Sequence, residues 1–390
     1  MQDNEKKPAL RFKGFTDPWE QRKLDEIANF SKGVGYSKND LCEEGTPIIL
    51  YGRLYTKYET SIFDVDTFVK EKAGSVYSKG GEVIVPASGE TAEDISIASV
   101  VVKPGILLGG DLNIVSPTTE YDSAFLALTI SSGAAHEYLS SLAQGKSVVH
   151  LHNADIQSVS AKFPTKREQE KIHLLFGKID TLITLHQRKY ERLVNIKKSM
   201  LDKMFPKNGA SVPEIRFKGF TDPWEQRKLG DLCVEFRSGE FISASDITET
   251  GEYPVFGGNG LRGFTDRFNH DGEYTLIGRQ GALCGNVNFA VGKSYFTEHA
   301  IAVRADKKNQ TRFLYYLFST MDLGQYSGQS AQPGLAVGNL VELKSTLPDK
   351  QEQEKISGVL TALDTLITLH QRKLEKLQNI KKSCLEKMFA

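Results

Sequence analysis

The sequence has few cysteines and no long apolar run. Its 390 residues include four cysteines, and no two of them stand at CxxC spacing. This scatter argues against a zinc ribbon, a redox pair or a disulfide framework, so we expect free thiols. No stretch approaches the ~20 apolar residues that a membrane span requires, and the first residues lack the apolar segment of a signal peptide. We therefore expect a cytoplasmic protein with no membrane partner.

Motifs for catalysis and nucleotide binding are also missing. The sequence has no GxxxxGK[ST] phosphate loop, no GxGxxG opening a βαβ unit, no HExxH and no GxSxG. It also lacks the Asn/Asp-Pro-Pro-aromatic tetrapeptide that amino-methyltransferases place at their target base. The pair His150 and His152 is a weak pattern for metal binding, and no metal site is expected. These absences predict a chain that is not itself an enzyme.

What the sequence does have is an internal duplication. Residues Arg11–Leu24 read RFKGFTDPWEQRKL, and Arg216–Leu229 repeat the same fourteen residues. A second pair of segments, Arg167–Phe205 and Gln351–Phe389, agrees at 26 of 39 positions. The two halves of the chain therefore share one frame, which predicts a pseudo-two-fold internal repeat.

The segments enclosed by this frame, Asp25–Lys166 and Gly230–Lys350, have little in common and differ in length by 21 residues. Both contain short β-branched runs bounded by Gly, Asn and Pro, such as EVIVP at Glu82–Pro86 and YTLI at Tyr274–Ile277. We expect two α+β domains built around twisted β-sheets. Two unlike segments enclosed by a repeated frame predict two domains that bind different targets. We call these two domains the heads.

The two variable segments are acidic, whereas the repeated frame is basic. Lys and Arg number 11 against 18 Asp and Glu in Asp25–Lys166, and 11 against 14 in Gly230–Lys350. DNA-binding domains usually carry a basic excess, so the charge balance does not by itself indicate nucleic-acid binding.

The matching 39-residue segments are predicted to be long helices. Thr165 followed by Glu168, and Asp349 followed by Glu352, fit a capping box, in which the glutamate side chain bonds an amide at the helix start. The helices should therefore begin near residues 166 and 350.

Apolar residues in both segments recur every seven positions, which is typical of a coiled coil. We predict that the two helices form an antiparallel coiled coil, with His186 and His370 facing each other near the pseudo-two-fold axis as buried register markers. Leu175, Leu182 and Ile196 are expected at the neighbouring seam position. The predicted seam consists of Ile172, Ile179, His186, Leu193, Ile356, Leu363, His370 and Leu377.

Taken together, the frame, the variable segments and the two P-x-x-x-E-Q helix starts resemble the specificity subunit of type I restriction-modification enzymes. The second variable segment carries strings of the kind found in that family: GRQGALCGNV at Gly278–Val287, FTEHAIAV at Phe296–Val303 and GQSAQPGL at Gly328–Leu335. In the first variable segment, Pro86–Glu90 and Gly109–Asp111 are predicted to take the places of the GRQG and TEH strings.

The resemblance implies a division of labour. Target recognition domains at residues 1–166 and 206–350 would each read one half of a split sequence in double-stranded DNA, and spacer helices at residues 167–205 and 351–390 would separate them. Two methyltransferase subunits would dock on the helices, bind S-adenosylmethionine and methylate adenine. Restriction subunits would use ATP and Mg²⁺ to translocate and cut DNA. This chain would bind no cofactor itself.

Base edges are read by Arg, Lys, Asn and Gln, and phosphates are bound by cations. We therefore expect DNA contacts from cations and their polar or aromatic neighbours in both heads, supplemented by contacts from the partner subunits because the heads are acidic. The candidates are Lys32, Tyr36, Lys38, Arg53, Tyr55 and Lys57 in the first head, and Arg237, Arg262, Arg267, Arg279, Gln280, Gln329 and Gln332 in the second.

Two other functions remain open at this point. The chain could be an adaptor whose variable domains bind proteins, in which case the assembled complex would ignore DNA sequence. It could also be a self-sufficient enzyme acting on DNA, which would require activity from this chain alone.

Overall fold

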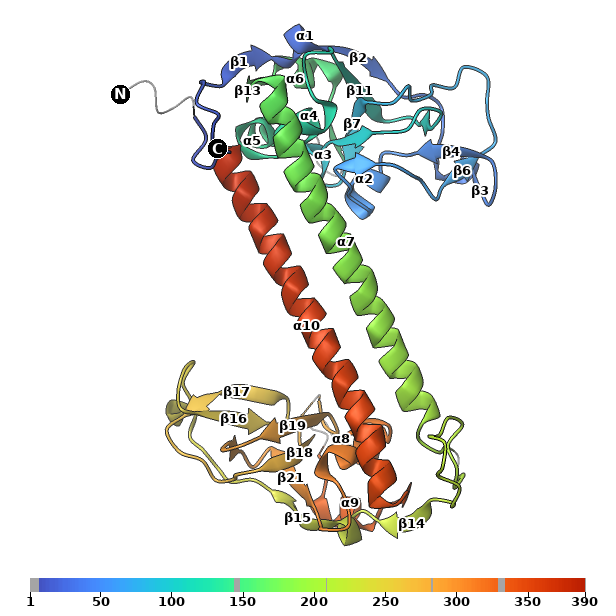
Figure 1. Ribbon diagram of the computed structural model, residues 1–390, viewed down its shortest axis with the longest axis vertical. Helices are drawn as coiled ribbons and strands as arrows, with labels where there is room; N and C mark the ends of the chain where they lie inside the picture. The colour runs from blue at the N-terminus through green and yellow to red at the C-terminus, as the bar shows by residue number, and fades with distance from the viewer. Residues whose placement is uncertain (1–6, 144–147, 208, 282, 329–333, 390) are drawn as a thin grey trace. The chain divides into compact units, whose positions relative to one another are not determined.

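The structure is a computed structural model that describes residues 7–143, 148–207, 209–281, 283–328 and 334–389. The chain divides into two compact units, unit 1 comprising Met1–Gln187 with Arg372–Ala390 and unit 2 comprising Arg188–Gln371 (Figure 1). Each unit holds one variable segment, one copy of the fourteen-residue repeat, the start of one long helix and the end of the other. The unit limits therefore fall inside the helices.

Unit 1 is built around a five-stranded sheet in the order β2-β11-β7-β9-β5. The central strand β7 is buried on both faces, as its continuous apolar run predicts. Val83 and Val85 face a core that includes α4, and Ile84 faces a second core on the other side of the sheet. The elements are β2 (Ala28–Lys32), β11 (Leu112–Pro117), β7 (Glu82–Pro86), β9 (Ser99–Val101), β5 (Ser61–Ile62), α4 (Ser123–Ile130) and α5 (Gly133–Leu142).

A smaller four-stranded sheet in unit 1 has the order β10-β4-β6-β3. Short helices and two strand pairs, β1 with β13 and β8 with β12, complete the unit. These elements are β1 (Glu20–Lys23), α1 (Leu24–Ile27), η2 (Lys38–Asp40), β3 (Leu41–Cys42), β4 (Thr46–Ile49), α2 (Arg53–Thr56), β6 (Phe68–Val69), β8 (Ser88–Gly89), α3 (Ala92–Ile95), β10 (Leu107–Leu108), β12 (Val149–His150), α6 (Asn153–Ser158) and β13 (Ser160–Phe163).

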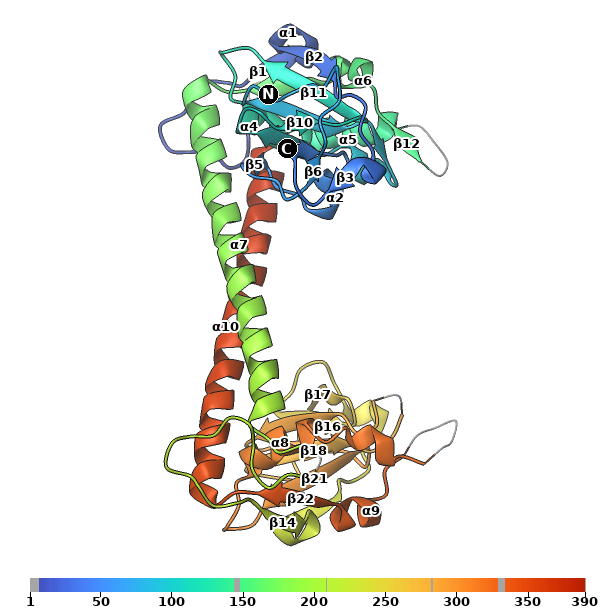
Figure 2. The same cartoon turned by 90° about the vertical axis from the view of Figure 1, so that its right-hand side faces the viewer.

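Unit 2 contains a four-stranded sheet, β15-β21-β18-β19, a three-stranded sheet, β17-β16-β20, and the pair β14-β22. Helix α8 packs on β18, β19 and β21 (Figure 2). The elements are β14 (Glu225–Lys228), η3 (Gly230–Leu232), β15 (Cys233–Ser238), η4 (Ala244–Asp246), β16 (Tyr253–Gly257), β17 (Gly260–Thr265), β18 (Glu273–Gly278), β19 (Val287–Val291), β20 (Tyr295–Phe296), β21 (Ala300–Ala305), α8 (Thr311–Ser319), η5 (Leu323–Tyr326), α9 (Val337–Glu342) and β22 (Lys344–Leu347).

The two variable segments share one topology in spite of their unlike sequences. In the sheet order, β2-β11-β7-β9 of unit 1 corresponds to β15-β21-β18-β19 of unit 2. In both units a two-residue strand pairs parallel with another strand of the smaller sheet, β10 with β4 and β20 with β16. The prediction of two α+β domains built around β-sheets is confirmed.

The two long helices are α7 (Lys166–Lys203) and α10 (Lys350–Met388), and they begin where the sequence predicts. Within each unit, the segments of α7 and α10 run antiparallel. In unit 1, Lys381 of α10 pairs with Asp180 of α7 at 2.5 Å, and Phe389 after the end of α10 contacts Phe176 near the start of α7. In unit 2, the equivalent ion pair joins Lys197 and Asp364 at 2.5 Å.

Part of the predicted seam is buried and part is not. Ile172, Ile179, Leu193, Ile356 and His370 are buried, while His186, Leu363 and Leu377 are half-buried. The expectation that Leu182 and Ile196 also lie in the seam is wrong, because both are exposed, at 44% and 38%. A pair of helices covers only one side of each helix, and these two residues lie off that side. His186 and His370 belong to different units, so the prediction that they face each other stays a prediction.

The capping-box interpretation of the glutamates is also wrong. Glu168 is fully buried and receives two hydrogen bonds of 2.7 Å from the guanidinium of Arg11, in the first fourteen-residue repeat. Glu352 is held in the same way by Arg216 at 2.8 Å. The amide of Glu352 does bond to the Asp349 side chain at 2.8 Å, as a capping residue requires. The glutamates join the repeat to the helix.

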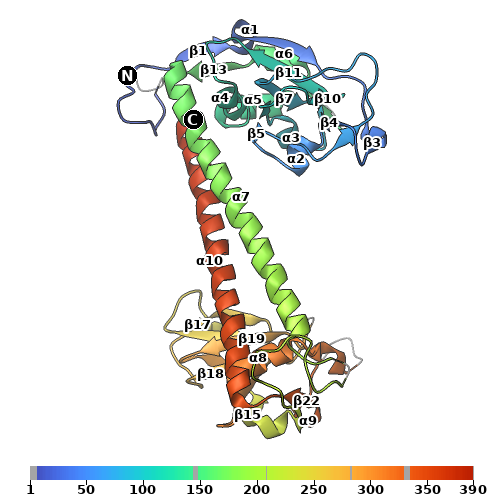
Figure 3. The same ribbon diagram turned by 45° about the vertical axis from the view of Figure 1, so that its right-hand side comes forward.

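The remaining contacts of the frame repeat in the same way. Strand β1 pairs with β13 at the start of α7 (Figure 3), and β14 pairs with β22 at the start of α10. Trp19 lies against Phe389 with ring centroids 6.3 Å apart, and Trp224 lies against Phe205 at 6.1 Å. These contacts explain why the two pairs of segments stay alike, since each copy of one segment packs against copies of the other.

None of the four cysteines, all of which lie in the described ranges, forms a disulfide, in agreement with the expectation of free thiols. Burial, with a smaller effect from Asp306, raises the pKa of the Cys233 thiol to about 12. This thiol is therefore unreactive at neutral pH.

Candidate nucleic-acid interface

Two of the strings singled out in the second variable segment, GRQGALCGNV and FTEHAIAV, meet at one end of the main sheet of unit 2, beside the GGNG turn at Gly257–Gly260. The turn at Gly258 touches the end of β18 so closely that a Cβ atom on Gly278 would lie 2.4 Å from the Gly258 carbonyl oxygen. The amide of Arg279 donates to the carbonyl of His299 at 2.9 Å. Close backbone approach therefore joins the GGNG turn, the GRQG string and the TEH string into one surface, which we call the unit 2 strand-end site.

The side chains of the unit 2 strand-end site are rich in hydrogen-bonding groups. Gln280 and Arg262 are exposed, and Arg279 is half-buried. The Nη1 atom of Arg279 lies 3.5 Å from the carbonyl oxygen of Glu298, and the Glu298 carboxylate pairs with His299 at 3.3 Å. Neither Arg262 nor Arg279 forms an ion pair with a described acidic side chain.

Two polar atoms beside this site are buried without a hydrogen-bond partner in the described part of the chain. They are Nδ2 of Asn288, on the strand β19 next to Gly260, and Oε2 of Glu298. Buried polar atoms almost always have partners in proteins, so unpaired donors and acceptors at an exposed site indicate groups that a ligand or water would satisfy.

Unit 1 has an equivalent site at the equivalent sheet end. The amide of Ala87, after β7, donates to the carbonyl of Asp111 at 2.8 Å, matching the bond from Arg279 to His299. The amide of Gly33 donates to the Leu112 carbonyl at 2.9 Å, and Gly239 donates to Ala300 at 3.0 Å. The prediction that Pro86–Glu90 and Gly109–Asp111 take the places of the GRQG and TEH strings is confirmed by this register.

The unit 1 strand-end site carries different side chains on the same backbone. Ala87 and Ser88 stand where unit 2 has Arg279 and Gln280, and Asp111 stands where it has His299. The hydroxyl of Ser88 shares a hydrogen bond of 3.1 Å with Nδ1 of His150 on the adjacent strand β12.

Two of the six candidates in the first head are tied into the protein. Tyr36 is 8% exposed and packs in a small core, while its hydroxyl accepts a hydrogen bond from the Lys72 amide at 2.7 Å. Arg53 is enclosed by Asp66 and Glu59, both at 2.7 Å. Hydrogen bonds from Lys57 and then Arg53 lower the pKa of Asp66 to about 2. Tyr36 and Arg53 therefore fit a structural role better than a contact with DNA.

The other four candidates of the first head lie nearer the surface. Lys32, at the end of β2 beside the unit 1 strand-end site, and Lys38 in η2 are exposed. Lys57 is exposed and pairs with Asp66 at 2.8 Å. Tyr55 packs edge-on against Tyr51 at 6.2 Å, and burial raises its pKa.

The two other described candidates of the second head, Arg237 and Arg267, are paired with acidic side chains. Arg237 on β15 donates to Glu235 at 2.7 Å. Burial opposes ionisation of Glu235, but hydrogen bonds from Arg237, Tyr274 and His270 outweigh it and lower the pKa. Arg267 pairs with Asp246 at 2.9 Å and lies over the Tyr295 ring. Gln329 and Gln332 lie outside the described residues.

Residue-type reasoning missed four side chains that the structure brings into the strand-end sites: Ser88, Asp111, His150 and His299. Asp111 and His299 directly precede β11 and β21, while Ser88 lies in β8 and His150 in β12, so their place along the chain relates them to strands. Charge alone could not have selected them.

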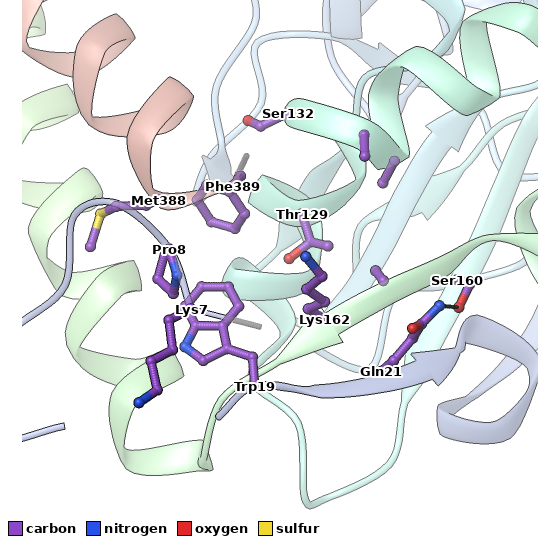
Figure 4. Close-up of a pocket in the computed structure, with 13 residues that line it drawn as sticks. Lys7, Pro8, Trp19, Gln21, Thr129, Ser132, Ser160, Lys162, Met388 and Phe389 are labelled. Atoms are coloured by element: carbon purple, nitrogen blue, oxygen red, sulfur yellow. Dashed lines mark hydrogen bonds between the residues drawn. The ribbon is translucent and has the colours of Figure 1, made fainter. Parts of the chain in front are cut away.

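A separate pocket of about 260 Å³ lies between the frame and the variable segment of unit 1, where β1 and β13 meet the end of α10. Figure 4 shows Trp19 and Phe389 on its wall, with Lys162 nearby. No carboxylate, cysteine or histidine is among its described lining residues. The described lining includes none of Ala87, Ser88, Asp111 and His150, so the pocket is distinct from the unit 1 strand-end site.

The chain matches known proteins along most of its length. The family model described as "Type I restriction modification DNA specificity domain" matches residues 16–195 and 221–379. The chain is 42% identical over 174 residues to the type I restriction enzyme EcoprrI specificity subunit of Escherichia coli, a match that covers 44% of this chain and 42% of that protein. It is 21% identical over 349 residues to the MjaVIII specificity subunit of Methanocaldococcus jannaschii, covering 82% and 80%.

A solved structure shares the fold. The type I restriction-modification S subunit from M. genitalium superposes with a TM-score of 0.74 at 16% identity, covering 98% of this chain and 99% of that one. In the described ranges, no helix has an apolar stretch of the length and composition needed to cross a membrane. The family match covers both halves of the chain, each with its own recognition segment, and so this protein belongs to the family of type I restriction-modification DNA specificity subunits, which recognise DNA and do not catalyse.

Proposed function

We propose that this chain reads a bipartite target in double-stranded DNA, with unit 1 reading one half and unit 2 the other, and that it directs partner subunits to methylate adenine or to restrict the DNA. The observation that carries this proposal is the pair of strand-end sites. The same backbone register presents Ser88 and Asp111 in one unit and Gln280 and His299 in the other. The two sites have the same backbone arrangement but different side chains. They are therefore suited to recognise two different half-site sequences, which we call words.

The acidic balance of the heads is compatible with this function. Many of their acidic groups are engaged with cations inside the head, such as Asp66 with Arg53 and Asp246 with Arg267. Phosphate contacts supply affinity without sequence information, so partner subunits can provide much of the affinity while the strand-end sites provide discrimination.

The helices offer a docking surface in each unit. Unit 1 exposes Leu182, Leu185 and Ile380 at 44%, 56% and 40%. The equivalent residues of unit 2, which follow the offset of 184 between the helix repeats, are also exposed: Leu366, Leu369 and Ile196 at 41%, 44% and 38%. We call these two sets the helix patches.

Exposed apolar patches of this kind mark protein interfaces. Two equivalent patches support two copies of one partner, which we propose to be methyltransferase subunits that carry S-adenosylmethionine. Restriction subunits that use ATP and Mg²⁺ would join the complex. No cofactor is assigned to this chain.

The experiment that tests the proposal is co-expression of the full chain with its methyltransferase partner in a host that lacks adenine methylation, followed by single-molecule sequencing of modified adenines. We expect two short words separated by a fixed gap, and no such motif without this chain. Replacing Gly230–Lys350 with the variable segment of another family member should change one word only. A stable complex that methylates without any sequence motif would contradict the proposal and favour an adaptor. Modification by this chain alone would favour an enzyme.

A further inference from the structure

The equivalence of the two strand-end sites allows a residue-level assignment that rests on the proposed function. The amide of residue 87 and the amide of residue 279 bond to equivalent carbonyls, at 2.8 and 2.9 Å. The next bond along the chain also repeats, since the amide of Leu151 donates to Ala87 at 3.1 Å and that of Leu335 donates to Arg279 at 2.8 Å. Each site is therefore bordered by three chain segments in one fixed arrangement.

In unit 2 this arrangement holds an arginine between two constraints. The backbone of Arg279 is fixed on both sides, by His299 and Leu335, so its side chain starts from a rigid point at the sheet end. Its guanidinium makes only one weak contact that the structure describes, 3.5 Å to a carbonyl oxygen. An arginine whose backbone is fixed and whose guanidinium donors are unpaired can bind the O6 and N7 acceptors of guanine in the major groove.

The unit 1 strand-end site presents a hydrogen-bond acceptor, the carboxylate of Asp111. Asp111 is exposed, and its carboxylate forms no ion pair with any described cation. Its backbone lies in the left-handed region at φ 57, which is unusual for a residue other than glycine. A carboxylate accepts hydrogen bonds from the exocyclic amino groups of cytosine or adenine and has no donor for guanine O6.

Left-handed backbone persists only where the surrounding structure holds it, and such positions cluster at functional sites. Here the holding contact is the bond from the Ala87 amide to the Asp111 carbonyl, which is part of the repeated register. The neighbouring Ser88 is tied to His150, which adds a second hydrogen-bonding group on the same surface.

We propose that Asp111 and Arg279 are specificity-determining residues of the two heads, with Asp111 reading a base that presents an amino group, cytosine or adenine, and Arg279 reading guanine. The two residues act on opposite half-sites. In unit 1 this replaces Tyr36 and Arg53 as the candidates for base reading.

The test uses the full chain assembled with its methyltransferase partner, with binding to a randomised duplex library and methylation mapping as two independent readouts. Arg279→Gln should reduce the preference for guanine at one position roughly 5- to 150-fold and leave the other word unchanged. Asp111→Asn keeps the shape but adds a donor, and Asp111→Gly removes the carboxylate at a φ that glycine favours. Both should lower the preference for an amino-bearing base at one position of the other word.

Matched controls lie outside the two main sheets. Arg227→Gln on β14 and Asp25→Asn in α1 make the same chemical changes at exposed positions, and neither should alter the motif. Arg279→Lys is a second variant of the arginine, which keeps the charge but loses the bidentate geometry.

The outcomes separate this inference from the proposed function. If the unaltered complex methylates a split motif and neither variant changes either word, the inference is overturned and the proposed function stands. If Arg279→Gln weakens binding to all sequences equally, Arg279 contacts phosphate and the assignment to guanine is wrong. If the unaltered complex shows no split motif, both ideas fall together.

Discussion

Arg11 binds Glu168 through two hydrogen bonds of 2.7 Å, and the pair joins the first fourteen-residue repeat to the start of α7. Glu168 is fully buried and the Arg11 side chain is 12% exposed. The same pair recurs in unit 2 as Arg216 and Glu352. In unit 2, the hydrogen bonds that Arg216 donates to Glu352 are the largest influence that raises the pKa of Arg216.

Removing one partner of this ion pair should destabilise unit 1 strongly. Arg11→Met leaves the Glu168 charge buried without a partner, a change that typically costs about 3–5 kcal/mol. The double variant Arg11→Met/Glu168→Met should recover a large part of that loss, because no unpaired charge remains. Urea denaturation of the single and double variants measures both effects. Equal stability of Arg11→Met and the unaltered chain would contradict the assignment.

The stability of unit 1 should depend on pH through His173 and Asp122, which lie 3.3 Å apart. The hydrogen bond to Asp122 raises the pKa of His173 in the folded protein. The contribution of His173 to the free energy of unfolding is therefore complete below about pH 6.5 and is lost as the pH rises through the folded-state pKa of His173. Burial raises the pKa of Asp122, but the bond from His173 outweighs it, so the Asp122 contribution is present above pH 3.8 and is lost on acidification. The pair should therefore stabilise most between these two values.

Unit 2 supplies the control for this pH dependence, because Ser357 and Gln310 take the places of His173 and Asp122 and do not titrate. His173→Ser, which copies the unit 2 residue, should make the decline in Tm between pH 5.5 and 8 shallower. Thermal unfolding of both proteins at several pH values tests this. Parallel curves for the two proteins would show that the pair does not govern the pH response.

The helix patches should each hold one methyltransferase subunit. Leu182→Asp in unit 1 or Leu366→Asp in unit 2 places a charge in an exposed apolar patch, so each variant should bind one partner where the unaltered chain binds two. Light scattering of the purified complexes gives the stoichiometry. Val234→Asp, at a 66% exposed apolar residue on β15, serves as the control. Loss of both partners from a single-patch variant would contradict independent docking.

Tyr36 should matter for stability and not for DNA sequence preference. Tyr36→Phe removes the acceptor for the Lys72 amide and the hydrogen bond to Ser75, at an expected cost of about 1–3 kcal/mol. Chemical denaturation measures this loss, and methylation mapping should return an unchanged motif. An altered word would restore Tyr36 as a base-contacting residue.

The frame of the protein could be predicted in detail because its signals are local or repeated. Helix starts at residues 166 and 350 follow from capping residues and apolar periodicity, which act over a few residues. The correspondence of Pro86–Glu90 with the GRQG string could also be predicted, because both follow a strand of continuous apolar residues. Within a family that keeps one topology, position in the chain is enough to align such segments.

The roles of single side chains could not be predicted in the same way. Arg53 and Arg279 look alike in sequence, yet Arg53 is enclosed by two carboxylates and Arg279 has free donors. Glu168 looked like a capping residue, but its partner is Arg11, 157 positions earlier in the chain. Contacts between distant segments decide these roles, and no local pattern encodes them.

The sequence by itself determined the duplication, the long helices, the two α+β heads and the family, because repeats and periodicity are properties of the chain alone. Only the tertiary structure decided which polar residues are partnered and which are free. It placed Asp111 and Arg279 in the two equivalent strand-end sites and left the helix patches exposed. The physical reason is that burial and pairing arise only when segments distant in the chain meet, and the hydrogen bonds between those segments fix which side chains keep unpaired polar groups.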